Sequence, residues 1–266
     1  MATSLIKYGR LYNYASASGG TILTGMSIPS QLDWQTLVDY IDGTYNMAVL
    51  TPHVRVGGVW KQCSNVWVKV DGVWKNNVSV LGKSPTPVEV GNRLKHPRKN
   101  GTPVLSSEYN TSVHPRWDAN NTHYGRDTVN FGGLPAGYYN TWLGQWMMAW
   151  SSTEFDGHSN YSFTLRHSTG AAGTQGYTGK AIKISVRLVR SATSSEQSNF
   201  SDGATIEQVS DYDGNVYDLI RIGTQVFNKQ NIASLRYSNG TSISNVSDPQ
   251  DNSDLVFFSS ASESIW

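Results

Sequence analysis

The segment IPSQLDWQTLVDYIDG (residues 28–43) carries the clearest signal of regular structure in this chain. Ser30 is placed to cap a helix, and Asp33 stands at the capping-box position three residues later. One face of the helix is apolar at helical spacing: Trp34, Leu37, Val38 and Ile41. Gly43 can end the helix. We therefore expect a helix that packs this face onto a core.

Beyond the helix the chain repeats itself. HVRVGGVWKQCSNV (53–66) and WVKVDGVWKNNVSV (67–80) align with each other, and each alternates apolar and polar residues as a strand does. Gly57-Gly58 and Asp71-Gly72 tolerate positive φ and suit two-residue hairpin turns. A single hairpin is only marginally stable in water. We therefore expect tandem hairpins whose equivalent Trp60 and Trp74 pack on another chain or on the main domain, as an assembly interface.

The composition indicates a neutral, polar surface. Charged residues make up 15% of the chain, against about 25% in an average soluble domain, and the formal net charge is +1. Such a chain has no global field that would attract nucleic acid or anionic lipid. Its Ser, Asn, Thr, Gly and Tyr are typical of antibody recognition loops, and equally of a turn-rich β protein.

Cysteine and hydropathy restrict the class further. Cys63 is the only cysteine, so the chain forms no internal disulfide. No apolar run approaches the ~18 residues that a membrane span requires, so we expect no membrane insertion. The N-terminus has no apolar leader, and we expect folding in a reducing bacterial cytoplasm.

Three later segments complete the outline. AIKISVRLVR (181–190) alternates apolar residues with Lys183 and Arg187, which predicts a strand with one solvent-facing side. The Ser-rich SATSSEQSNFSDGA (191–204) is typical of a linker. NVYDLIRIGTQVFNKQNI (215–232) predicts a hairpin that turns at Gly223-Thr224, with glycine at the position a type II′ turn prefers.

Several motifs now occur in one order: GRLYNYAS (9–16), IPSQLDWQTLVDYIDG (28–43), VGNRLK (90–95), HPRWDANNTHYG (114–125), FGGLPAGYY (131–139), AWSSTEF (149–155) and ISVRLVR (184–190). This ordered set resembles the Fibrobacter succinogenes major paralogous domain, a C-type-lectin-like family of Bacteroidetes and their phages. The resemblance implies an α+β fold, with a lectin-like domain formed by 1–51 and 84–191. Inserted hairpins (52–83), a linker (192–204) and a C-terminal β segment (205–266) complete the expected organisation.

Two departures from the family pattern affect this interpretation. The family's terminal strand carries a cysteine where this chain has Leu188. The segment DYDGNVYDLIRIGTQVFNKQNIASLRYSNGTSI (211–243) resembles the one that normally opens the domain, yet here it follows the end. It either folds back onto its own domain, as in a circular permutation, or completes a neighbouring subunit. In both cases we expect Val226 and Phe227 to be buried where it docks, and we assign them, with Trp60 and Trp74, to the assembly interface.

The residues suggest no catalytic or metal chemistry. Formylglycine-generating enzymes, which share the broad fold of the family, need two active-site cysteines, and this chain has one. Its six histidines show no zinc-protease spacing. Asp211, Asp213 and Asn215 are similar to part of a calcium loop, but Ile222 stands where a ligand is needed and a turn is the better interpretation. Asp248, Asp251 and Asp254 are a weak calcium signal. We expect no cofactor and no metal.

By the resemblance, the recognition face is built from the loops 138–147 and 156–179. The candidate contact set has aromatic or hydrogen-bonding side chains: Tyr139, Trp142, Trp146, His158, Tyr161 and Tyr177. Loop residues surround Trp142 and Trp146, which favours their exposure and stacking on a sugar or a protein surface. A Trp-rich core under a glycine loop is the alternative.

The expected function is that of a non-enzymatic phage virion surface protein. It would be a tail-fibre or receptor-binding component that recognises a host glycan or protein, located on the virion and forming homo-oligomers. The alternative is a capsid-decoration or fibre-connecting protein that binds only other virion proteins. A bacterial surface adhesin is a third, less expected, interpretation.

Overall fold

The computed structural model describes residues 8–45, 47–50, 53–57, 59–62, 68–70, 73–75, 80–83, 89–97, 115–120, 122–138 and 141–249. The chain divides into two compact units. Unit 1 comprises Met1–Val38 and Glu89–Trp266, and unit 2 comprises Asp39–Val88. The named strands all pair in antiparallel fashion and helices accompany them, so the class is α+β.

Helix α3 (Gln31–Tyr45) follows the predicted cap. The Asp33 amide donates to Ser30 Oγ over 3.1 Å, and the Ser30 amide donates to Asp33 Oδ2 over 2.8 Å, so the capping box is confirmed. Trp34, Leu37 and Ile41 are buried, as the spacing predicted, while Val38 is half-buried. The helix runs two residues past Gly43, so this glycine does not end it.

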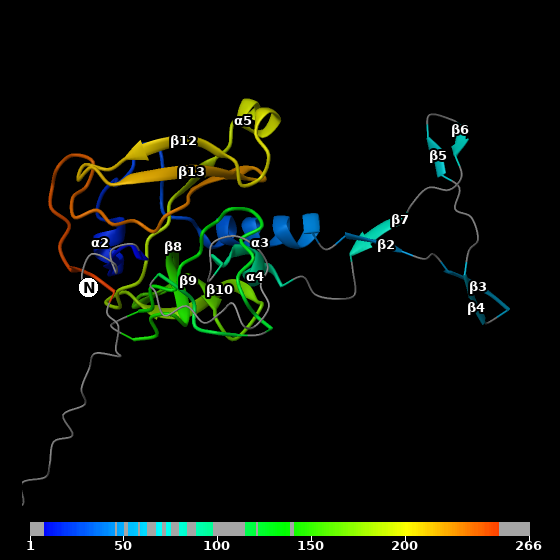
Figure 1. Cartoon of the computed structure of the whole chain (residues 1–266), viewed down its shortest axis with the longest axis horizontal. Helices are drawn as coiled ribbons and strands as arrows, with labels where there is room; N and C mark the ends of the chain where they lie inside the picture. The colour runs from blue at the N-terminus through cyan, green and yellow to red at the C-terminus, as the bar shows by residue number, and fades with distance from the viewer. Residues whose placement is uncertain are drawn as a thin grey trace, which may run out of the picture. The chain divides into compact units, whose positions relative to one another are not determined.

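The first sheet of unit 1 holds β8 (Trp146–Asp156), β9 (Ser159–Arg166) and β10 (Ala172–Gly179) in the order β10-β9-β8 (Figure 1). Because side chains alternate along a strand, one face carries Met147, Ala149, Phe163 and Leu165, all buried. Phe163 stacks on Trp34 with ring centroids 4.3 Å apart. This face therefore packs on helix α3. On the opposite face Met148 and Trp150 are buried in a second part of the core, and Trp146 at the start of β8 is half-buried.

The second sheet orders β11 (Val189–Ser191), β14 (Gln225–Asn228), β13 (Val216–Ile222) and β12 (Thr205–Ser210) side by side. β13 and β14 form the predicted hairpin, with Ile222 opposite Gln225 and Gly223 at φ 60°. β14 pairs with β11 of the same chain, where Val226 faces Arg190 across the ladder. The late segment thus folds back onto its own unit.

Val226 and Phe227 are fully buried in this chain. Phe227 packs on Trp34, with ring centroids 5.6 Å apart. Both side chains lie in the core of their own chain, which corrects the expectation that they form part of an assembly interface. The Ser-rich stretch expected to be a linker connects β11 and β12 of this same sheet, and it contains a short helix, α5 (Ser194–Asn199), with a capping box formed by Thr193 and Glu196.

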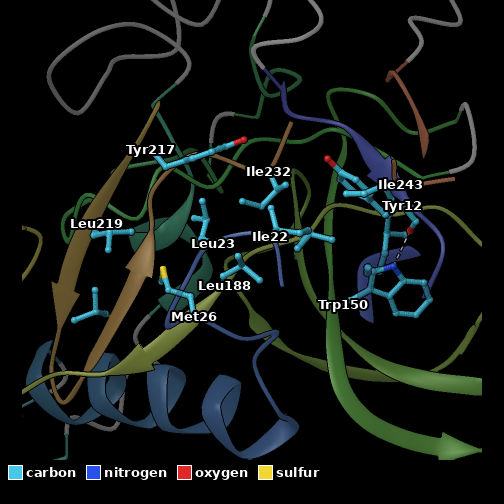
Figure 2. Close-up of a cluster of buried hydrophobic side chains, with 14 of the residues drawn as sticks. Tyr12, Ile22, Leu23, Met26, Trp150, Leu188, Tyr217, Leu219, Ile232 and Ile243 are labelled. Carbon is cyan, nitrogen blue, oxygen red and sulfur yellow. Dashed lines mark hydrogen bonds between the residues drawn. The ribbon is translucent and has the colours of Figure 1, made fainter. Parts of the chain in front are cut away.

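The core joins the two ends of unit 1. β1 (Leu11–Tyr12) pairs with β15 (Val246–Ser247), and short helices α2 (Tyr14–Ser18) and α4 (Val90–Leu94) flank the sheets. Figure 2 shows the indole of Trp150, on β8, donating to the carbonyl oxygen of Tyr12 over 2.7 Å. Trp150 and Tyr12 belong to one hydrophobic cluster with side chains from early, middle and late segments: Ile22, Leu23, Met26, Leu188, Tyr217, Leu219, Ile232 and Ile243.

The segment 181–190 corrects an expectation. Only its last residues belong to a strand, and Arg187, predicted to face solvent, is fully buried. Its guanidinium donates to Asn231 Oδ1 and to the carbonyl oxygens of Phe131, Gly132 and Asn228. The alternation failed as a guide to exposure because the segments 131–132 and 228–231 cover the side that carries Arg187. A buried arginine is stable when its donors are satisfied.

Unit 2 contains the repeats. β3 (His53–Val56) pairs with β4 (Val59–Gln62), and β5 (Val68–Val70) pairs with β6 (Val73–Lys75). Both hairpins therefore reverse where the sequence predicted. Trp60 and Trp74 hold equivalent register positions, opposite Arg55 and Lys69, and their side chains lie outside the described residues. A further pair, β2 (Met47–Leu50) with β7 (Val80–Lys83), extends the unit beyond the predicted insert.

No helix within the described residues is both long and apolar enough to cross a membrane.

Candidate recognition site

At one end of the first sheet, where β8 begins and β9 ends, an arginine stacks on a tryptophan. Trp146, at the start of β8, pairs with Arg166, at the end of β9, so both side chains project from the face opposite α3. The Arg166 guanidinium lies 3.9 Å from the Trp146 ring centroid, within cation-π range. Its Nη2 donates to Gln175 Oε1, on β10, over 3.0 Å. Side chains from three strands thus hold the Arg166 guanidinium in one position on the surface.

Trp142 extends this surface from the loop before β8. Its side chain is 45% exposed, and its ring centroid lies 6.1 Å from that of Trp146. Tyr138 also packs on Trp146, with centroids 6.1 Å apart and in an edge-on arrangement. Paired backbone hydrogen bonds between Tyr138 and Thr141 close the loop, and the amides of Gln145 and Trp146 donate to the Trp142 carbonyl oxygen. These backbone hydrogen bonds therefore hold Trp142 in its exposed position.

Tyr177 lies on the edge strand β10, at a β-bulge. The register between β10 and β9 shifts between Gln175 and Thr178, and such bulges redirect side chains. The Tyr177 side chain is 76% exposed, with its ring centroid 4.1 Å from that of Phe155. A Cβ on the neighbouring Gly176 would lie only 2.7 Å from the Phe155 ring, so the bulge requires glycine there.

Trp142 and Tyr177 share an uncommon backbone conformation, with φ of 64° and 66°. For residues with a Cβ this left-handed region costs about 1–2 kcal/mol, and for bulky side chains it is rare. Strained residues of this kind concentrate at binding and active sites. Two exposed aromatic side chains in strained backbone, on one face of the molecule, single out this surface as the candidate site.

Two hollows mark the surface. One, of about 160 Å³, lies between the aromatic groups and is lined by Tyr138, Trp146, Met148, Gln175, Tyr177, Thr178 and Ile182. The other, of about 490 Å³, is lined by Thr164, Arg166, Thr169, Ala171, Ala172, Gly173, Thr174 and Gln175. Gln175 borders both. We call Tyr138, Trp142, Trp146, Arg166, Gln175 and Tyr177, with these two hollows, the Trp146 face.

A buried lysine shapes the loop that borders the larger hollow. Lys95 is fully buried, and its Nζ donates to the carbonyl oxygens of Arg166 and Thr169, both over 3.0 Å, and to that of His123. Burial lowers the pKa of Lys95 to about 7, although the Glu89 carboxylate favours the charged form. Lys95 thereby holds the end of β9 and the loop after it to the segment around His123.

Not all the predicted contact residues lie on the Trp146 face, although Tyr161 and Tyr177 share the Phe155 ring as a neighbour. Trp142, Trp146 and Tyr177 lie on the Trp146 face. Tyr161 packs edge-on against Phe155, with centroids 5.2 Å apart, and His158 is exposed in the turn between β8 and β9, at the far end of these strands. Tyr139 lies outside the described residues.

Sequence reasoning missed Tyr138, Arg166 and Gln175 as members of the site. They come from a loop and two strands, and only the register that places Trp146 opposite Arg166 joins them. The predicted loop 156–179 consists mainly of the strands β9 and β10, in keeping with the alternation noted around Phe163.

No group of three or more metal-ligating side chains occurs among the described residues. Asp211 instead holds the predicted turn, because its carboxylate accepts from the amides of Asp213 and Asn215 and from the Tyr217 hydroxyl. Asp248 forms an ion pair with Arg10 over 2.9 Å, and Asp251 and Asp254 lie outside the residues that the structure describes.

Comparison of the chain with protein-family models, with curated proteins and with solved structures finds no match. The resemblance to the C-type-lectin-like family therefore rests on the ordered sequence motifs. A function can be inferred only from those motifs together with the geometry of the Trp146 face.

Proposed function

We propose that this chain is a non-enzymatic surface protein of a phage virion, a tail-fibre or receptor-binding component with a C-type-lectin-like domain. It binds a host glycan or protein through the Trp146 face. The observation that carries the proposal is the strained, exposed placement of Trp142 and Tyr177. Tyr177 lines the smaller hollow, and Trp142 packs on Trp146, which lines the same hollow. The virion location rests on the resemblance to the phage-borne family.

The physical chemistry of the face suits recognition. Aromatic rings bury a large area at a small cost in side-chain entropy, and they stack on sugar rings or apolar protein groups. The bulge and the closed loop hold Tyr177 and Trp142 before a ligand arrives, which lowers the entropy lost on binding. Arg166 and Gln175 add directional donors between the rings.

Binding to intact host cells tests the proposal. The labelled full chain should bind host Bacteroidetes cells and reduce phage adsorption in competition. A double variant, Trp142→Ala with Tyr177→Ala, should bind at least about ten-fold more weakly, the loss expected for one or two binding hot spots. Tyr212→Ala is the matched control, since Tyr212 is exposed at a turn of the second sheet. Unchanged binding by the folded double variant contradicts the assignment of this face.

A second candidate is a structural role, as a capsid-decoration or fibre-connecting protein. The tandem hairpins favour it, because unit 2 is compact by itself and such two-stranded pieces need a partner surface. This function predicts co-purification with other virion proteins, or self-association through Trp60 and Trp74, without any binding to host cells. Cell adsorption and virion pull-down, measured on the same preparation, separate the two.

A further inference from the structure

The charge on the Trp146 face is isolated. Arg166 is the one ionic side chain among the residues that line the two hollows, and the rest are aromatic, apolar or neutral polar groups. Arg166 is half-buried and its hydrogen bond to Gln175 is exposed, so the guanidinium is accessible to an anionic ligand.

Carboxylates on the adjoining loops do not neutralise this charge, because they are occupied elsewhere. Glu89 Oε1 lies 3.2 Å from His123 Nδ1, and its other oxygen lies 3.9 Å from an Arg126 nitrogen. Asp118, near the loop of Trp142, pairs with Arg116 over 2.9 Å. Among the described residues that line the two hollows, Arg166 therefore carries the only formal charge, and no ion pair with a carboxylate is found for it.

The guanidinium is held in place with most of its donors free of a partner among the described residues. An arginine has five N–H donors, and the interaction with Gln175 uses one of them. Stacking on Trp146 fixes the plane of the group. A planar, fixed fork of N–H groups matches the two oxygens of a carboxylate.

We propose that the Trp146 face binds an acidic saccharide, with a sugar carboxylate on Arg166 and neighbouring sugar rings against Trp142 and Tyr177. The inference rests on the function proposed above and specifies its ligand as a glycan that carries uronic or sialic acid. The larger hollow, of about 490 Å³, is within the range typical of small-ligand sites. The aromatic groups supply affinity for any sugar, and Arg166 supplies the preference for the acid.

The test uses polysaccharide extracted from the host cells, as isolated and after carbodiimide–borohydride reduction of its carboxylates to alcohols. Calorimetric titration with the full chain should give at least about ten-fold tighter binding of the native polymer, as a charge-assisted hydrogen bond implies. Arg166→Gln should bring the ratio of the two affinities close to one while retaining binding to the reduced polymer. Arg190→Gln, which removes the same charge on the second sheet, should preserve the wild-type ratio.

Other outcomes overturn the inference. Equal affinity of the wild type for native and reduced polymer, with binding still lost in the Trp142 and Tyr177 double variant, means a neutral glycan; the proposed function then stands and the acidic ligand does not. Sensitivity to desulfation or dephosphorylation in place of carboxylate reduction identifies another anion. If Arg190→Gln loses the preference for the native polymer as fully as Arg166→Gln does, the preference comes from nonspecific charge attraction. Absence of any binding to host cells overturns both proposals.

Discussion

Arg187 and Asn231 form a buried hydrogen bond: Nε of the arginine donates to Oδ1 of the asparagine over 2.7 Å. The Asn231 amide in turn donates to the carbonyl oxygen of Tyr8 over 2.8 Å. One side-chain pair therefore links the N-terminal segment, the segment before β11 and the turn after β14. This pair ties the late segment 211–243 to the rest of unit 1.

Replacement of Arg187 tests this linkage. Arg187→Met leaves four buried acceptors without their donor and should lower the free energy of unfolding by more than about 3 kcal/mol. Arg187→Lys keeps a charge but not the planar fork, so its loss should be smaller than that of the methionine variant. Arg190→Met, which removes a partly exposed ion pair with Glu196, should cost about 1 kcal/mol or less. Urea unfolding measures all three, and equal losses for Arg187→Met and Arg190→Met contradict the prediction.

The positive φ at Tyr177 predicts that a glycine variant is more stable than an alanine variant at this position, the reverse of the usual order. Tyr177→Gly should be more stable than Tyr177→Ala by about 1 kcal/mol, because φ of 66° is unfavourable for any residue with a Cβ. Both variants lose the ring equally and should bind host cells equally weakly. Tyr161, on β9 with ordinary backbone, is the control: there glycine should be less stable than alanine. Thermal unfolding of the four variants tests this prediction. If alanine is more stable than glycine at both positions, Tyr177 is not strained.

The buried Lys95 predicts a pH-dependent contribution to stability. Its pKa is lowered to about 7 in the folded chain, while an unfolded lysine titrates near about 10.4. Between these values the unfolded state binds more protons, so the free energy of unfolding rises with pH. The quantity to compare is the free energy of unfolding of the wild type minus that of Lys95→Met. It should be constant below pH of about 6 and should increase between pH of about 7 and 10, by at most about 1.4 kcal/mol per pH unit. Urea titrations across this range measure it; a flat or falling difference contradicts it.

Truncation after Ser194 should prevent unit 1 from folding. It removes β14, which pairs with β11, and it removes Val226 and Phe227 from the core. The exposed edge of β11 and the uncovered face of Trp34 should cause aggregation during purification. Light scattering and thermal melting report the result. A truncated chain that remains monomeric with an unchanged melting temperature shows instead that the C-terminal segment is an independent module.

Deletion of residues 52–82 should leave unit 1 folded, because the hairpins belong to a separate compact unit. The melting temperature of unit 1 should change little, and cell binding through Trp142 and Tyr177 should persist. If Trp60 and Trp74 serve assembly, the deletion should abolish self-association or incorporation into virions, as measured by sedimentation and by particle pull-down. A deletion variant that fails to fold contradicts the modular organisation.

Local signals in the sequence determined the local structure. Ser30 with Asp33 specified the start of α3, and Gly223-Thr224 specified the turn of the β13–β14 hairpin. Residues that contact each other within a few positions control such features, so their types are sufficient. The α+β class was instead an expectation from the resemblance of the ordered motifs, and the mixture of helices and antiparallel strands is compatible with it.

Only the tertiary structure decided the rest. The burial of Arg187 depends on acceptors 41 to 56 residues away, and the meeting of Trp146, Arg166 and Gln175 depends on the register of three strands. A shift of one residue in that register would turn each side chain to the opposite face. The strained exposure of Tyr177 likewise follows from a bulge packed against Phe155. Composition and periodicity do not encode these contacts, because the contacts depend on how segments remote in sequence pack together in one core.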